Sequence, residues 1–126
     1  MAKQLSRRAE PLPQLLIPVP LHRTRLMQRG YNQAQELARV ITQSLAISLM
    51  PHAATRLQAT PDQIGLTRTQ RRKNLKGAFV MDDCVKGLHI ALLDDVMTTG
   101  ATLTELTQAA RKAGATKIEV WAAARA

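Results

Sequence analysis

The sequence predicts an α/β protein with a three-layer architecture: a mostly parallel, twisted sheet with helices on both faces. Continuous apolar runs at 15–19, 89–93 and 117–124 are typical of strands that are buried on both faces. Two segments, 32–45 and 102–113, repeat apolar residues at helical spacing. The last two strands and the helix between them form a βαβ unit, whose strands are parallel.

The first half of the chain contains one strand and one helix with clear boundaries. Residues 1–14 are polar and are expected to form a leader, followed by a single domain at 15–126, because 126 residues is the size of one domain. Pro18 and Pro20 end the first strand, since proline cannot donate to a sheet ladder. Asn32 is expected to cap the helix with its side-chain oxygen.

The middle of the chain has weaker patterns. Residues 48–58 contain a weak strand, and residues 59–77 are polar and basic, which predicts a long loop. A short strand is expected at Phe79–Met81. A hairpin turn is expected to start at Asp82-Asp83 and to end near Gly87.

The C-terminal third has the clearest local signals. A turn is expected at 94–100, and the two acids that open it are expected to be exposed. Thr102 and Glu105 have the spacing of a capping box at the start of the following helix. Gly114 is expected to stop this helix, because glycine is common just past a helix end.

The chain carries a strong positive charge, since 18 Lys and Arg against nine Asp and Glu give +9. Such a surface favours anions, including nucleotides and nucleic acid. Aromatic residues make up only 2%, which argues against a protein that stacks single-stranded bases on rings. Cys84 is the only cysteine, which excludes an internal disulfide and fits a cytoplasmic protein. No apolar run approaches the ~18 residues of a membrane span, so no membrane contact is expected.

Residues 91–102 carry the clearest chemistry. An apolar strand ends in Asp94 and Asp95 and leads through a turn of small residues into a helix. The turn offers backbone N–H groups, hydroxyls and the positive end of a helix dipole, which suits a phosphate. Carboxylates repel phosphate, but they accept hydrogen bonds from sugar hydroxyls or hold Mg²⁺ against a diphosphate. A sugar phosphate fits this combination, and a polar strand-to-helix turn without a ligand explains the residues about equally well.

The segment Leu92–Thr102 (LLDDVMTTGAT) resembles the phosphoribosyl diphosphate (PRPP) loop of type I phosphoribosyltransferases. Ile17–Arg23 followed by Arg29–Gln33, and Gly65–Phe79, resemble the ComF/GntX branch of that family. The resemblance covers about residues 15–125 and implies the three-layer fold. Members of this branch usually carry an N-terminal zinc ribbon, which a sequence with one cysteine lacks.

The resemblance implies roles for the loops at the carboxyl edge of the sheet. Asp94 and Asp95 would hold the ribose hydroxyls and Mg²⁺ and act as catalytic residues. Arg72 and Lys73 lie in the loop that closes over the site in such enzymes, and they would act on the anion as further catalytic residues. The 5-phosphate would contact Met97, Thr98, Thr99, Gly100, Ala101 and Thr102. The diphosphate would contact Leu21, His22, Arg23 and Arg25.

Two functions are compatible with these observations. The first is transfer of phosphoribose from PRPP to a nitrogen acceptor that the sequence does not identify, with Mg²⁺ as cofactor; the ligand is PRPP or a ribonucleotide 5-phosphate. The alternative is a non-enzymatic competence protein of DNA uptake that uses the fold as a binding scaffold. The first is favoured because the basic loops would surround the ligand pocket, so we expect only weak, salt-sensitive contact with DNA. The oligomeric state stays open, with a homodimer as one option.

Overall fold

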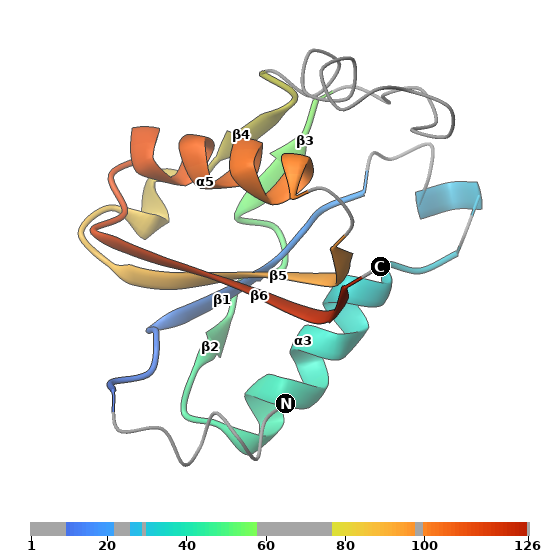
Figure 1. Ribbon diagram of the computed structural model, residues 1–126, viewed down its shortest axis with the longest axis horizontal. Coiled ribbons are helices and arrows are strands. Elements are labelled where there is room, and N and C mark those ends of the chain that lie inside the picture. The colour runs from blue at the N-terminus through green and yellow to red at the C-terminus, as the bar shows by residue number, and fades with distance from the viewer. Residues whose placement is uncertain (1–9, 22–25, 29, 58–76, 98–99, 126) are drawn as a thin grey trace.

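A computed structural model describes residues 10–21, 26–28, 30–57, 77–97 and 100–125. Its main sheet has four strands in the order β2-β1-β5-β6, and all neighbours in it are parallel (Figure 1). The strands are β1 (Leu15–Pro18), β2 (Ser48–Leu49), β5 (His89–Met97) and β6 (Lys117–Arg125). Around the sheet lie the helices α3 (Gln33–Ser44) and α5 (Ala101–Lys112) and an antiparallel ribbon of β3 (Ala54–Arg56) and β4 (Phe79–Met81).

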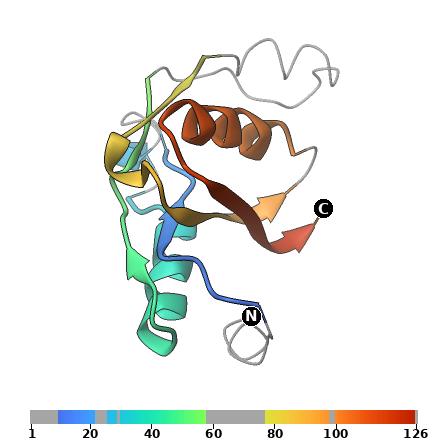
Figure 2. The same cartoon turned by 90° about the vertical axis from the view of Figure 1, so that its left-hand side faces the viewer.

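The two helices cover opposite faces of the main sheet, which confirms the predicted three layers. In Figures 1 and 2, α3 lies against one face, and α5 lies on the other face together with the β3–β4 ribbon. Alternate residues along a strand point to opposite faces, so each strand contributes to two cores. Leu16 and Leu93 belong to the core under α3, whereas Ile17 and Leu92 belong to the core under α5. Burial on both faces therefore explains the continuous apolar runs of β1 and of the first half of β5. The same expectation for 117–124 is wrong, because β6 lies at the edge of the sheet and Trp121 is its one buried residue among 117–124.

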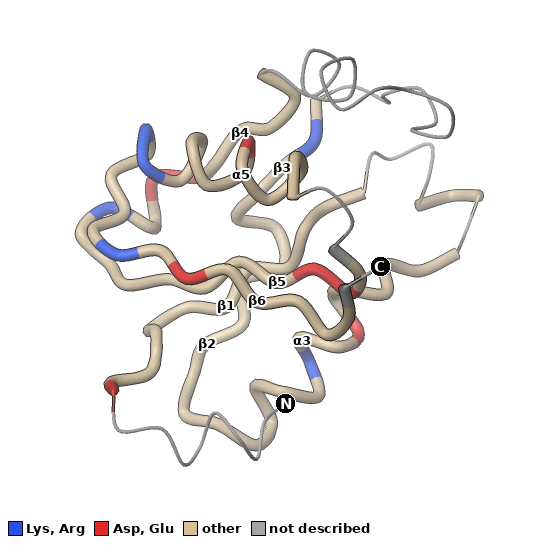
Figure 3. Tube along the Cα trace, in the orientation of Figure 1, with Lys and Arg blue, Asp and Glu red and all other residues tan. Residues whose placement is uncertain are grey.

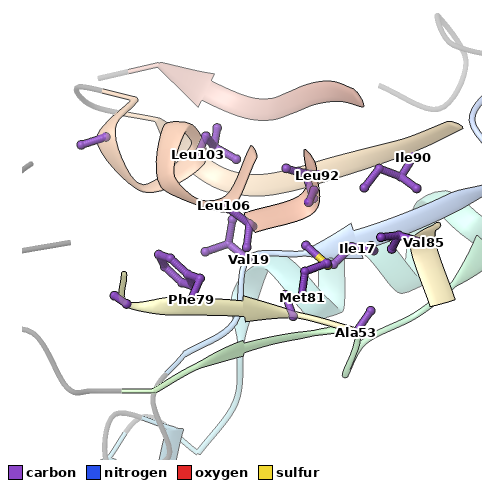
Figure 4. Close-up of a cluster of buried hydrophobic side chains, with 14 residues drawn as sticks. Ile17, Val19, Ala53, Phe79, Met81, Val85, Ile90, Leu92, Leu103 and Leu106 are labelled. Carbon is purple, nitrogen blue, oxygen red and sulfur yellow. The ribbon is translucent and has the colours of Figure 1, made fainter. Parts of the chain in front are cut away.

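The core under α5 joins elements that are distant in the sequence. Figure 4 shows Leu103 and Leu106 of α5 on one side of this cluster, and Phe79 and Met81 of β4 on the other. Leu106 is completely buried there. The β3–β4 ribbon is thus held to the domain by the same apolar face that seats α5 on the sheet.

The middle of the chain differs from the prediction. The expected weak strand at 48–58 is two short strands, β2 in the main sheet and β3 in the ribbon. The expected hairpin turn after Phe79–Met81 is wrong, because β4 pairs with β3 and not with the strand that follows it. The connection to β5 is instead a short 3₁₀ helix at Asp83–Val85, whose first turn is capped by the Asp82 carboxylate accepting from the Cys84 N–H at 2.8 Å.

Both predicted helices form, with different outcomes at their caps. Asn32 caps α3 as expected, because its Oδ1 accepts from the Gln35 N–H at 3.2 Å. The predicted capping box at Thr102 is wrong: the cap of α5 is Gly100, which has a positive φ of 78° and no side chain to bond the helix. Gly114 ends α5 as expected, with a φ of 100°.

A half-buried contact between a histidine and a glutamate joins β5 to β6 on the α3 side of the sheet. His89 Nε2 lies 2.6 Å from Glu119 Oε2, and the Trp121 indole N–H donates to the other oxygen of Glu119 at 3.3 Å. No local sequence pattern relates His89 to Glu119, because the register pairs residues that are 28 positions apart in the chain, such as His89 and Lys117. Beside this pair, the Gln14 side chain accepts from the His89 N–H at 3.1 Å, and Pro13 is completely buried.

Within the described residues, no helix is both long enough and apolar enough to cross a membrane.

Candidate functional site

The predicted acid pair lies at the carboxyl edge of the main sheet, but inside a strand. The prediction of an exposed turn that starts at Asp94 is wrong, because β5 continues to Met97. The ladder between β5 and β6 pairs Asp94 with Ala122 and Val96 with Ala124, which keeps both acids extended. Asp94 and Asp95 are accordingly half-buried.

Burial changes the protonation of Asp94. It raises the pKa of Asp94 to about 7, and the hydrogen bond and negative charge of the adjacent Asp95 side chain act in the same direction. The Asp95 N–H donates to Asp94 Oδ1 at 2.9 Å, which favours the carboxylate but does not outweigh burial. Near neutral pH, Asp94 is therefore charged in only part of the molecules. A cation bound at this carboxyl would displace its proton.

The helix that follows the acids begins at the same edge of the sheet. Gly100 places the first turn of α5 just after the end of β5, with Ala101 buried and Thr102 half-buried. The Gly100 carbonyl accepts from both the N–H and the hydroxyl of Thr104, at 2.9 and 2.8 Å. Gly100 makes no side-chain cap bond, and the positive end of the α5 dipole lies at this edge of the sheet.

The end of β1 adjoins this edge on the other side. The Val19 N–H donates to the Leu93 carbonyl at 2.8 Å, and the Val19 carbonyl accepts from Asn32 Nδ2 at 3.0 Å. Asn32 thus joins the end of β1 to the start of α3 in addition to capping that helix. The loop between them, which carries the predicted diphosphate contacts, starts from this fixed point.

An open pocket of about 260 Å³ lies between the end of β1, the start of α3 and strand β3. It is lined by Leu21, one of the predicted diphosphate contacts, by the helix cap Asn32, and by side chains for which no role was predicted. The most prominent is Arg56, whose guanidinium lies over the Phe79 ring at 5.5 Å from its centroid. No local pattern marks Arg56, because its place depends on the pairing of β3 with β4.

The structure thus brings together only part of the predicted site. Asp94, Asp95, Gly100, Ala101 and Thr102 lie at one edge, and Leu21 lies at the neighbouring pocket. The backbone of Met97 ends β5. The remaining predicted residues lie outside the described part of the chain: His22, Arg23, Arg25, Arg72, Lys73, Thr98 and Thr99.

The architecture defines the class of protein. Glutamine phosphoribosylpyrophosphate amidotransferase from Bacillus subtilis, solved with ADP and GMP, matches with a TM-score of 0.64 at 16% identity, over 97% of this chain and 25% of that chain. A structure of a glutamic acid mutant at an invariant aspartic acid of HPRTs matches with a TM-score of 0.52 at 14% identity, over 99% of this chain and 70% of that chain. The chain has the fold of the type I phosphoribosyltransferases.

Proteins with similar sequences indicate which group within this fold class the chain resembles. Competence protein F of Haemophilus influenzae is 42% identical over 118 residues, which is 91% of this chain and 52% of the relative. DNA utilization protein YhgH of Escherichia coli K12 is 37% identical over 114 residues, which is 90% of this chain and 50% of the relative. The chain is thus similar in sequence to proteins named for competence and for DNA utilization, and it spans about half the length of these two curated relatives. No protein-family model matches it.

Proposed function

We propose that the carboxyl edge of the sheet binds PRPP or a ribonucleotide 5-phosphate together with Mg²⁺, as part of a phosphoribosyltransferase. The observation that carries this proposal is the position of the two half-buried acids, which lie at the end of β5 directly before the start of α5. The helix start suits the 5-phosphate, and the carboxylates suit the ribose hydroxyls. One ligand that contains both groups uses both features.

The acid pair also fits Mg²⁺. This ion takes oxygen ligands and usually binds through one or two carboxylates plus the phosphates of a substrate. Asp94 and Asp95 supply two carboxylates of this kind, and the phosphates of the substrate would complete the site. Burial raises the pKa of Asp94, and a bound cation would compensate the charge of its carboxylate. When bound, Mg²⁺ would neutralise charge on the diphosphate.

The proposed reaction moves phosphoribose from diphosphate to nitrogen. The bond from the anomeric carbon to the diphosphate oxygen breaks, a nitrogen of the acceptor forms the new bond, and the diphosphate leaves as an anion. The chain would contribute by holding the ribose at Asp94 and Asp95 and the phosphate at the start of α5. Arg72 and Lys73 stay predicted contacts of the leaving diphosphate, on the family resemblance.

A second candidate function is handling of DNA without catalysis. It is favoured by the names of the relatives, which refer to competence and to DNA utilization, and by the net charge of +9. In that case the acid pair and the helix start would bind a nucleotide as a sensor, or would have no ligand. Release of diphosphate from bound PRPP separates the two functions, because a sensor binds its ligand without breaking that bond.

Calorimetric titration with PRPP and with ribose 5-phosphate, with and without Mg²⁺, tests the first proposal. Asp94→Asn and Asp95→Asn should each weaken binding of PRPP about ten- to a hundredfold, because each loses a charge-assisted contact of about 1.5–3 kcal/mol. The matched control is Asp83→Asn, the same change at an exposed acid of the 3₁₀ helix. It should leave the affinity unchanged.

Two outcomes would contradict the proposal. A folded wild-type chain that binds neither ligand excludes a ribose phosphate site. Equal affinity in the wild type and in both variants at the acid pair shows that these carboxylates do not contact the ligand.

A further inference from the structure

Strand β4 has one edge that its partner strand does not use. In an antiparallel pair, residues that exchange two hydrogen bonds alternate with residues that exchange none. The Asp82 N–H donates to the Ala53 carbonyl at 2.7 Å, and the Leu57 N–H donates to the Ala78 carbonyl at 2.8 Å. These two hydrogen bonds show which pairs of residues are the bonded ones. Every second pair is bonded, so the pair midway between them, Thr55 and Val80, is bonded as well.

Phe79 and Met81 therefore direct their N–H and C=O groups away from β3. Within the described part of the chain, no hydrogen bond reaches these four groups. The side chains of both residues are buried in the core under α5, so the strand cannot rotate to use them elsewhere. Groups of this kind need a partner from water or from another molecule.

A groove of about 270 Å³ runs along the same strand, between β4 and the C-terminal half of α5. It is lined by Phe79, Val80, Met81, Ala109, Lys112 and Ala113. Figures 1 and 2 both show β4 beside α5. The two alanines leave room next to the strand, Val80 is 49% exposed, and Lys112 is the one charged side chain among these lining residues.

We infer that this groove binds an extended peptide segment of a partner protein, which adds to β4 as a strand and places an acidic side chain beside Lys112. Phe79 and Met81 are two residues apart, so their outward groups repeat at about 7 Å along the strand. Another extended backbone offers donors and acceptors at the same repeat, and this is how peptides add to sheet edges. Alanine and valine suit small apolar side chains of the peptide, and Lys112 suits a carboxylate.

This site is separate from the proposed phosphoribosyl site. The groove uses residues 109–113 at the end of α5, whereas the acid pair precedes the start of that helix. The inference therefore does not depend on the proposed function, and Asp94→Asn should leave peptide binding unchanged.

Hydrogen exchange followed by NMR tests the free edge directly. In the isolated chain, the Val80 amide should be protected by its bond to β3, while the Phe79 and Met81 amides should exchange at least about tenfold faster. Equal protection of all three amides would show that the edge is already paired and would overturn the inference.

Peptide titration tests the occupant. The probe is a capped eight-residue peptide that alternates valine with threonine and glutamate, compared with a lysine-for-glutamate version and with a version N-methylated at alternate residues. The first peptide should slow exchange at Phe79 and Met81, the lysine version should bind about three- to tenfold more weakly, and the N-methylated version should not bind. Unchanged exchange at both amides with the first peptide at millimolar concentration overturns the inference.

Two matched pairs of variants locate the contact. Met81→Pro removes the outward N–H and Met81→Ala keeps it, although both lose the side chain, so only the first should abolish binding of the glutamate peptide. Lys112→Glu should weaken that peptide about three- to tenfold and favour the lysine version, whereas Lys86→Glu, outside the groove, should do neither. If Met81→Pro does not fold, the Lys112 pair and the N-methylated peptide still decide the question, and equal effects of Lys112→Glu and Lys86→Glu would contradict the site.

Discussion

At Asp94, burial and the neighbouring Asp95 both disfavour the charged carboxylate. A carboxylate with a purely structural role is usually stabilised by a cation or by several N–H donors. For Asp94, the main contact that stabilises the charged form is the Asp95 N–H. Groups whose pKa is shifted in this way are concentrated at functional sites, although structural networks also produce such shifts. The cost to stability at Asp94 can be measured without knowledge of the ligand.

The pH dependence of unfolding should report this cost. The folded pKa of Asp94, about 7, lies above its ordinary value of 3.8, so the folded chain binds more protons than the unfolded chain between these pH values. The contribution of Asp94 to stability is fully present below about pH 3.8 and is lost as the pH rises to about 7. Asp94→Asn should therefore be more stable than the wild type at pH 8, by about 1–2 kcal/mol after allowance for solvent screening, with a smaller difference at pH 5. Urea unfolding at both pH values measures this, and a variant that is less stable than the wild type at pH 8 contradicts it.

At the scale of one element, α5 is defined by how it ends. The Gly114 N–H donates to the Arg111 carbonyl at 3.0 Å and the Ala115 N–H to the Ala110 carbonyl at 3.1 Å, which is a Schellman motif. The Gly114 carbonyl then accepts from the Gly87 N–H at 2.8 Å, so the helix end is tied to the segment that leads into β5. A β-carbon at Gly114 would lie 2.9 Å from Lys86 Cγ.

Substitution of Gly114 should therefore cost more than backbone strain alone. Gly114→Ala meets both a φ of 100° and the Lys86 side chain, and we expect a loss of about 1–3 kcal/mol in the free energy of unfolding. Gly87→Ala is the matched control, because its φ of 76° carries strain but open space surrounds its β-carbon position, and it should cost less. Adding Lys86→Ala should recover part of the loss at Gly114. Denaturant melts of these variants measure the effect, and equal losses at Gly114 and Gly87 would show that Lys86 imposes no constraint.

At the scale of the whole molecule, the described charges separate along β5. The acid pair lies at its carboxyl end, while Lys86 and Lys117 precede β5 and start β6, and Arg111 and Lys112 end α5 nearby. Figure 3 shows these basic positions around the opposite end of the sheet from the acids, together with acidic positions of the 3₁₀ segment. All four cations are exposed, and none has an ion pair among the described residues.

This arrangement predicts weak contact with duplex DNA that depends steeply on salt. About four phosphate contacts would lower the affinity about a hundredfold between about 50 and 200 mM salt, because bound cations release counterions from the duplex. Exchange of Lys86 and Lys117 for glutamine should reduce the slope by about two contacts. Arg39→Gln, at the exposed Glu36 pair on α3, is the control and should have little effect. Fluorescence anisotropy over a salt series measures the slope, and tight, sequence-dependent binding at high salt would instead favour the DNA-handling function.

The candidate site could be predicted only in part. The residue types at Asp94–Thr102 indicated a sugar phosphate because carboxylates, small residues and a helix start follow one another in the chain. Arg56 at the neighbouring pocket and the raised pKa of Asp94 could not be predicted, since each depends on neighbours from other elements. Arg72 and Lys73 stay predictions, because they lie outside the described residues.

The sequence by itself determined the parallel βαβ unit, the burial of β1 and the first half of β5 on both faces, the cap at Asn32 and the stop at Gly114. All of these depend on periodicity or on the conformational preference of one residue, which are local properties. Tertiary structure alone decided that β5 continues through the acids, that β3 pairs with β4, and that His89 meets Glu119. Each of these depends on which strand lies alongside, and strand pairing joins residues far apart in the chain that no local pattern relates.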